Sequence, residues 1–192
     1  MLRVSGGTLC GRRLISPAQG QQIRPTTERV REAIFSMLLD SLPGAQVLDL
    51  FAGTGTLGIE ALSRGAQRVL FVEQQPLARR LIQTNLRQCG LQQQARLLAD
   101  SAVAATSYAR LHAMVVDWGP FDVVFMDPPW QYDQELIGAA LMLLAATELL
   151  REGAWVIAEH ESPTVEVATP PWSLVKQRRY GRTYITIWSW SP

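Results

Sequence analysis

The fold of this 192-residue chain is decided by residues 47–58, which read Val47-Leu48-Asp49-Leu50-Phe51-Ala52-Gly53-Thr54-Gly55-Thr56-Leu57-Gly58. The first five residues are apolar except for Asp49, a composition typical of a strand buried on both faces of a parallel sheet. Gly53 and Gly55 let the backbone turn sharply and approach a ligand closely. Ligands of open parallel sheets bind outside the carboxyl ends of the strands, so this turn predicts a binding site.

Strand and helix patterns alternate on both sides of this segment. We expect a first helix that starts within residues 25–28 and is ended by Pro43-Gly44. Further helices are expected at 57–64, at 76–89 and from the end of the fourth strand through residue 150, and strands at 47–51, 68–73, 95–98, 121–126 and 155–159. Residues 174–176 and 184–188 flank Tyr180-Gly181-Arg182 and predict an antiparallel hairpin at a sheet edge. The pattern predicts a Rossmann-like α/β fold with a seven-stranded sheet whose last strand is antiparallel. Residues 101–120 have the least readable pattern of the chain.

The two ends of the chain differ from the middle in shape. Residues 1–24 predict an extended arm or small β-hairpin, with a turn near Gly11 or at Ser16-Pro17, and residues 25–192 predict one domain.

No apolar run approaches the roughly 20 residues that span a bilayer, and no apolar segment follows Arg3 as a signal peptide requires. We therefore expect a cytoplasmic protein without membrane contact, with Cys10 and Cys89 as reduced thiols and without a metal site.

The net charge of +1 conceals an uneven distribution. Residues 1–31 hold six arginines against Glu28 alone, residues 32–166 hold eight arginines against sixteen acids, and residues 167–192 hold four basic residues and no acid, so the segments carry +5, −8 and +4. Basic ends favour contact with a polyanion. We expect nucleic-acid contact from the N-terminal segment, because arginine suits phosphate contacts and base stacking. We interpret the C-terminal charges as solvated surface.

The glycine turn is compatible with two cofactors. Its glycine spacing also matches a dinucleotide site, and Glu73 lies 20 residues beyond Gly53, where a ribose-binding acid is expected. Asp49 favours S-adenosylmethionine, because a buried carboxylate can order the loop or receive the amino group of the methionine moiety but would repel a pyrophosphate. Asp100 either accepts a hydrogen bond from the adenine amino group or caps a helix. The predicted cofactor residues are Asp49, Phe51, Gly53, Gly55, Glu73, Gln74, Asp100 and Ser101.

The apolar strand at residues 121–126 runs into Asp127-Pro128-Pro129-Trp130. Two prolines cannot continue a central strand, and they stiffen the loop. An exocyclic amino nitrogen is a poor nucleophile, which Asp127 and the main-chain carbonyl of Pro128 can orient by accepting its N–H groups. Trp130 offers a face on which an extruded base stacks, a contact worth about 1–3 kcal/mol. We interpret these four residues as catalytic, acting by alignment of the nitrogen with the methyl group to be transferred.

With these motifs the chain resembles the bacterial RsmD family, which methylates N2 of a guanine in 16S ribosomal RNA. The resemblance covers nearly the whole chain, and many amino methyltransferases share its cofactor and catalytic motifs. It also rests on residues 3–7, 11–14 and 58–65. The discriminating part is Arg24-Pro25-Thr26-Thr27-Glu28-Arg29-Val30-Arg31-Glu32.

The resemblance implies a monomer in which residues 25–192 form the methyltransferase domain and residues 1–24 form a small hairpin that helps to hold RNA. It implies that the target is guanine 966 of 16S rRNA in an assembling 30S particle. The expected RNA-binding residues are Arg3, Arg12, Arg13, Arg24, Thr26, Arg29 and Arg31. Trp130 departs from the Phe or Tyr that the family often carries, and stacking survives that change.

Two alternatives stay open. A methyltransferase of DNA adenine or of protein glutamine would share the cofactor loop and the proline motif. A chain of 192 residues leaves no room for a separate target-recognition domain, however, and those enzymes typically carry Asn in place of Asp127. A non-enzymatic RNA-binding module with the same fold would have no need of an intact Asp127 to Trp130.

Overall fold

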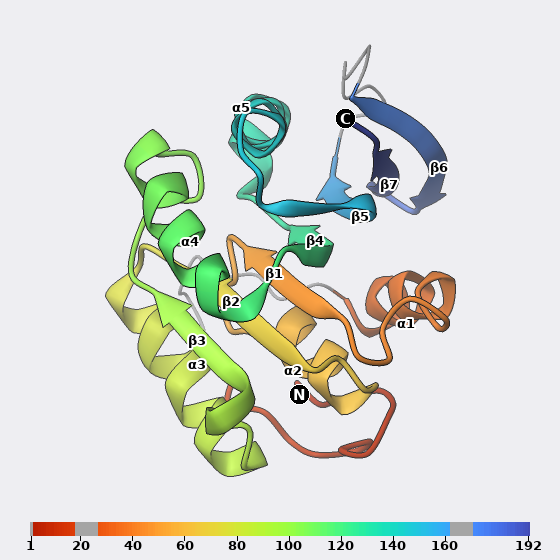
Figure 1. Ribbon diagram of the computed structural model, residues 1–192. Helices are drawn as coiled ribbons and strands as arrows, with labels where there is room; N and C mark the ends of the chain where they lie inside the picture. The colour runs from red at the N-terminus through yellow and green to blue at the C-terminus, as the bar shows by residue number, and fades with distance from the viewer. Residues whose placement is uncertain (1, 18–26, 162–170) are drawn as a thin grey trace.

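The computed structural model describes residues 2–17, 27–161 and 171–192. These residues form a central β-sheet with helices packed against it (Figure 1). The elements, with η for 3-10 helices, are α1 (Glu28–Met37), β1 (Gln46–Leu50), α2 (Thr56–Ser63), β2 (Arg68–Val72), α3 (Pro76–Cys89), η1 (Gln92–Gln94), β3 (Ala95–Leu98), α4 (Ala105–Trp118), β4 (Phe121–Met126), η2 (Trp130–Tyr132), α5 (Asp133–Ala145), β5 (Leu150–His160), β6 (Trp172–Tyr180) and β7 (Thr183–Trp190). The strand order is β3-β2-β1-β4-β5-β7-β6. β1 to β5 are parallel and β7 is antiparallel to both neighbours. The predicted fold class is confirmed.

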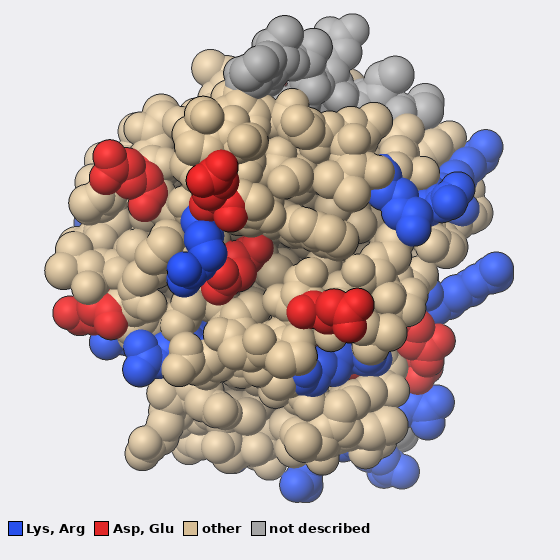
Figure 2. All heavy atoms as spheres, turned by 45° about the vertical axis from the view of Figure 1, so that its right-hand side comes forward, with Lys and Arg blue, Asp and Glu red and all other residues tan. Residues whose placement is uncertain are grey.

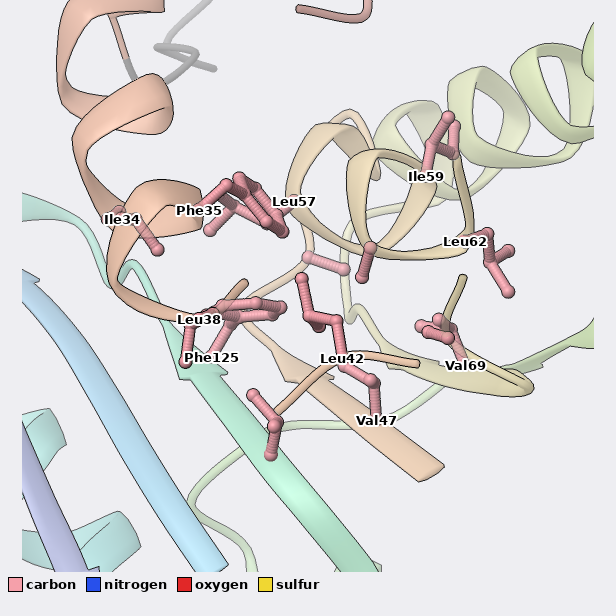
Figure 3. Packing of buried hydrophobic residues seen from close by; sticks show 14 of the residues in the cluster. Ile34, Phe35, Leu38, Leu42, Val47, Leu57, Ile59, Leu62, Val69 and Phe125 are labelled. Carbon is pink, nitrogen blue, oxygen red and sulfur yellow. The ribbon is translucent and has the colours of Figure 1, made fainter. Parts of the chain in front are cut away.

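The helices cover both faces of the sheet, with α1, α2 and α3 on one face and α4 and α5 on the other (Figure 1). All five residues of β1 are buried, because alternate side chains of a strand point to opposite faces and both faces are covered. Val47 packs in the cluster under α1 and α2, and Leu48 packs in the cluster under α4 and α5. Figure 3 shows Phe35 and Leu57 from the two helices above Phe125 of β4.

The N-terminal arm, residues 2–17, packs on the α1–α3 side of the sheet. Its two limbs are joined by one bridge between Arg3 and Arg13 and by the hydrogen bond from Leu14 N–H to the Leu2 carbonyl, 2.9 Å. Leu2, Val4 and Leu14 are buried in the core cluster under α1 and α2. The arm is therefore anchored by its apolar side chains, and its predicted boundary at residue 24 lies outside the described residues.

Three stretches differ from the predictions. The first helix, expected to be ended by Pro43-Gly44, ends at Met37, where the Leu38 N–H donates to the Phe35 carbonyl at 3.3 Å and the chain continues in turns. The helix expected to run through residue 150 ends at Ala145, where the Thr147 hydroxyl donates to the Leu143 and Leu144 carbonyls, 3.1 Å each. β5 accordingly begins at Leu150, five residues early, and continues through an irregularity in its pairing with β4. Residues 101–120 contain α4, which buries only three residues and so shows a weak apolar period. No helix in the described part of the chain combines the length and apolarity needed to cross a membrane.

Candidate active site

A cavity of about 550 Å³ lies at the carboxyl ends of β1, β2, β4 and β5. Its lining residues are Thr27, Asp49, Phe51, Ala52, Gly53, Thr54, Thr56, Leu57, Val72, Glu73, Gln74, Gln75, Ala78, Ala102, Asp127, Pro128, Pro129, Trp130, Gln131, Glu159 and Glu161. Because β1 and β4 are neighbours in the sheet, the glycine turn and the proline motif share this cavity. The lining contains all four predicted catalytic residues and, of the cofactor set, Asp49, Phe51, Gly53, Glu73 and Gln74.

The turn after β1 depends on its glycines. Gly53 and Gly55 have φ of 55° and 76°, in the left-handed region that a side chain disfavours. Phe51 has φ of 60°, a strained value for an aromatic residue of the kind found at ligand sites. A Cβ on Gly58 would lie 2.2 Å from the Phe71 ring, so this glycine allows α2 to pack closely on β2.

Asp49 is buried, with 1% of its surface exposed, and it orders the turn. Its Oδ2 accepts the N–H of Gly58 at 2.9 Å, which holds the first turn of α2 against β1. Burial raises the pKa of Asp49 well above its usual value, and the nearby carboxylates of Asp127 and Glu73 raise it further against the opposing hydrogen bond from Gly58. A cationic ligand would relieve this repulsion.

Glu73, at the end of β2, supports the glycine turn from the other side. Its Oε2 accepts the N–H of Gly53 at 2.8 Å and its Oε1 accepts the N–H of Gln75 at 2.7 Å. A carboxylate has about four acceptor positions, so both oxygens retain capacity for the hydroxyl groups of a ribose. The residue thus holds the loop in shape while it lines the cavity.

The proline motif leaves β4 and turns immediately into η2. Pro129 precedes that 3-10 helix, and its carbonyl accepts the N–H of Tyr132 at 3.0 Å. Pro128 is buried, whereas Asp127 and Trp130 are half-buried at the cavity. Prolines fix φ, so the carbonyl groups of this loop have little freedom to reorient.

Twelve of the 21 lining residues were not predicted as site residues, among them Glu159, Glu161 and Thr27. Ala158 of β5 pairs with Met126 of β4, so Glu159 and Asp127 follow at matching positions on adjacent strands. Glu159 is only 5% exposed. An acid that ends an apolar strand is the signal that identified Asp49, and it would have identified Glu159 too. Glu161 follows β5, and Thr27, the predicted cap of α1, brings the start of that helix to the cavity.

Asp100 and Ser101 are not among the residues that line the cavity, and neither is Gly55. The Asp100 carboxylate accepts the Ser101 N–H at 2.9 Å and pairs with Arg110 at 2.8 Å. The Ser101 hydrogen bond is the largest cause that lowers the pKa of Asp100, and Arg110 contributes as well. These contacts are local, but Asp100 does not cap α4, which begins at Ala105 with Ala104 as its N-cap. Ala102 reaches the cavity instead.

The expected RNA-binding arginines divide into exposed and buried members. Arg3, Arg12, Arg13 and Arg29 are exposed, and Arg3 forms a 3.0 Å ion pair with Glu28. Arg24 and Thr26 lie outside the described residues. The prediction for Arg31 is wrong, because this side chain is only 1% exposed.

Arg31 holds the arm to the domain instead. It pairs with the fully buried Glu60 of α2 at 3.3 Å and donates to the Arg3 carbonyl at 2.6 Å. Glu60 also accepts the N–H and hydroxyl of Ser5, both at 2.8 Å, and pairs with Arg64 at 2.8 Å. A buried charge needs partners, and here an arginine from α1 and polar groups from the arm supply them.

The sheet order, the antiparallel β7 and the shared cavity define an S-adenosylmethionine-dependent methyltransferase. The family model described as Conserved hypothetical protein 95 matches residues 2–189. The chain therefore belongs to this family, which is the RsmD family that the sequence motifs indicated.

Relatives and solved structures agree with this assignment over nearly full length. Ribosomal RNA small subunit methyltransferase D of Escherichia coli is 33% identical over 182 residues, 94% of this chain and 86% of the relative. The solved Escherichia coli protein yhhF is 29% identical with a TM-score of 0.79, covering 99% of this chain and 98% of its own. The Thermus thermophilus protein TTHA0928 is 31% identical with a TM-score of 0.74, covering 97% and 98%.

Proposed function

We propose that this protein transfers a methyl group from S-adenosylmethionine to the exocyclic N2 of a guanine in 16S rRNA. By family resemblance the guanine is number 966, and the enzyme acts as a cytoplasmic monomer on an assembling 30S particle. The observation that carries the proposal is the common cavity in which the glycine turn meets Asp127 to Trp130. A donor held by the turn and a base stacked on the motif would be close enough for direct transfer.

The residues of the cavity fit this donor. S-adenosylmethionine supplies an electrophilic methyl group on a positively charged sulfur and also carries an ammonium group. Asp49, Glu73 and Asp127 provide a negative field that suits these cations and would repel a pyrophosphate. Glu73 is placed to accept hydrogen bonds from ribose hydroxyls, and the left-handed backbone at Gly53 permits a close approach.

Asp127 would orient the target nitrogen. Its carboxylate accepts one N–H of the amino group, and the rigid carbonyl of Pro128 accepts the other, so that the lone pair points at the methyl carbon. As the N–C bond forms at the expense of the donor's S–C bond, the nitrogen would become positively charged, and the negative Asp127 would stabilise it in a half-buried site where charges interact strongly. The nitrogen would then lose one proton to water to give the neutral product. Trp130 stacks on the base and so fixes the orientation of the base plane relative to the methyl group.

Glu159 favours guanine over adenine as the target. Guanine presents two adjacent donors, N1–H and N2–H, whereas adenine presents an N–H beside an unprotonated ring nitrogen. The Glu159 carboxylate lies on the strand next to Asp127 and lines the same cavity. Acceptors on two adjacent strands match the two donors of guanine, and the lone pair of the adenine ring nitrogen would be repelled.

The experiment compares wild type with Asp127→Ala on 16S rRNA, and mass spectrometry locates the product. We expect wild type to form N2-methylguanine at one nucleotide. We expect Asp127→Ala to lower kcat by at least about a hundredfold, because the substitution removes an acceptor used by the reacting nitrogen. Donor affinity should be nearly unchanged, because Asp49 and Glu73 still supply negative charge to the cavity. Activity that persists in Asp127→Ala, or a product on an adenine, would overturn the proposal.

Glu159→Gln tests the choice of base separately. The amide replaces one acceptor oxygen by a donor, so kcat/KM for the guanine substrate should fall by about ten- to a hundredfold, the range of one good bidentate contact. Gln134→Ala, an exposed change on the first turn of α5, serves as the control. Equal activity of Glu159→Gln and wild type would remove Glu159 from base recognition.

A further inference from the structure

The edge strand β6 is exposed along most of its length. Residues 173–179 are all exposed, and among the described residues β6 pairs with β7 alone. The strand carries Lys176, Arg178 and Arg179, Arg182 follows in the turn, and residues 167–192 contain no acid. Arg179 is engaged locally, since it donates to the Gly181 carbonyl and lies 5.5 Å from the centre of the Tyr184 ring.

The register of the hairpin decides which face Lys176 and Arg178 share. They pair with Ile187 and Ile185 of β7, and paired residues of adjacent strands point to the same face. Both isoleucines belong to the core cluster under α1, so the two basic side chains lie on the α1 side of the sheet. Arg29 is exposed on α1. Figure 2, with this side turned forward, shows Lys and Arg side chains gathered along one edge of the molecule.

The turn between β6 and β7 lies at the end of the sheet that holds the cavity. Tyr184, just after the turn, pairs with His160 at the carboxyl end of β5. Arg182 forms an ion pair with Glu161, which lines the cavity. Thr27 brings the first turn of α1, with Arg29, to the same cavity. Basic residues therefore flank the cavity from two elements, α1 and the β6–β7 hairpin.

We propose that Lys176, Arg178 and Arg182 form a second RNA-contacting surface, which binds backbone phosphates next to the nucleotide whose base enters the cavity. The occupant is RNA because Lys176 and Arg178 are exposed, residues 167–192 contain no acid, and the surface borders the proposed target site. The charge of Arg182 is partly neutralised by its ion pair with Glu161. This inference rests on the proposed function. The N-terminal arm and the hairpin would then hold the RNA from two sides, and the charges interpreted from the sequence as solvated surface take part in binding.

The test uses the double variant Lys176→Gln/Arg178→Gln in the full-length protein with a 16S rRNA transcript. Both side chains are exposed, so the thermal midpoint should not change. The Kd for the transcript and KM should rise about tenfold at physiological salt, with kcat unchanged at saturating RNA. The slope of log Kd against log salt should fall by about 1.4, since each lost phosphate contact contributes about 0.7 for single-stranded RNA.

The control is Arg96→Gln/Arg151→Gln, which removes the same charge from β3 and from the start of β5, away from the cavity, together with the ion pairs to Asp117 and Asp122. An equal loss of affinity in both double variants would reduce the effect to net charge and overturn the inference. Unchanged KM and salt slope in Lys176→Gln/Arg178→Gln would also overturn it, and would point to a protein partner on the exposed Leu174 and Val175. Absence of methylation by wild type would instead contradict the proposed function.

Discussion

Two buried carboxylates lie close together in the chain and have opposite surroundings. Glu60, fully buried inside α2, is paired with Arg31 and Arg64. Asp49, 1% exposed near the end of β1, accepts one backbone N–H and is repelled by the negative charges of Asp127 and Glu73, which raise its pKa. The first region neutralises its charge within the protein, whereas the second concentrates negative charge around a cavity.

The charges that surround a buried carboxylate distinguish a structural region, such as that around Glu60, from a ligand site, such as that around Asp49. Where arginines surround an acid, as at Glu60, the ion pairs join the arm, α1 and α2. Where acids converge and a pKa rises, as at Asp49, the folded protein retains an unfavourable interaction that a cationic ligand can relieve. Substitutions in the two regions should therefore change stability in opposite directions.

The largest expected effect is that of Glu60→Ala. Removing this carboxylate leaves Arg31 buried without its partner, so the free energy of unfolding should fall by about 3–5 kcal/mol. Thermal and urea denaturation measure the loss, and limited proteolysis of residues 2–17 should show that the arm is released. Glu28→Ala is the control, since it removes only the exposed pair with Arg3 and should cost less than about 1 kcal/mol. Similar losses in both variants would contradict the scaffold role of Glu60.

Asp49→Asn should have a smaller effect of the opposite sign on stability. The amide oxygen still accepts the Gly58 N–H, while the charge repelled by Asp127 and Glu73 disappears. The protein without donor should become about 1 kcal/mol more stable at neutral pH, as is common when a strained functional group is replaced. Calorimetry should show S-adenosylmethionine affinity falling about tenfold or more. Lower stability with unchanged affinity would assign Asp49 to the scaffold.

The smallest effect is a pH dependence. Because the pKa of Asp49 is higher in the folded than in the unfolded protein, the folded state binds more protons in the interval between the two values. Stability should therefore decline as pH rises through that interval, while affinity for the cationic donor should increase. Titration calorimetry in buffers of different ionisation enthalpy should detect proton release on binding by wild type. The same pH dependence in Asp49→Asn would assign it to another group.

Much of the fold could be predicted because its elements have local signals. The predicted bounds of α3, β3 and β4 match the structure, since Pro76 opens the helix, Gly90 ends it in the left-handed conformation, and β4 is a short apolar run. The cavity was predictable for a related reason. Asp49 and Asp127 each follow apolar residues of a parallel strand, and carboxyl ends of neighbouring parallel strands meet at one edge.

The unpredicted features depend on contacts between distant residues. Arg31 belongs to a stretch of arginines, and its burial follows from Glu60, which reaches it only after α2 packs beside α1. Asp100 was expected either at the cofactor or as a helix cap, and its ion pair with Arg110, ten residues later in α4, has no local sequence signal. The early start of β5 depends on pairing with Phe121 of β4, which the β5 sequence does not encode by itself.

The sequence by itself determined the alternation of strands and helices, the glycine turn and the proline motif, because these depend on backbone preferences and local apolar period. Only the tertiary structure decided how each charge is used. It buried Arg31 against Glu60, placed Lys176 and Arg178 on the α1 side of the sheet, and brought Glu159 beside Asp127. The physical reason is that the effect of a charge depends on its solvation and its neighbours in space, and strand register and helix packing decide both.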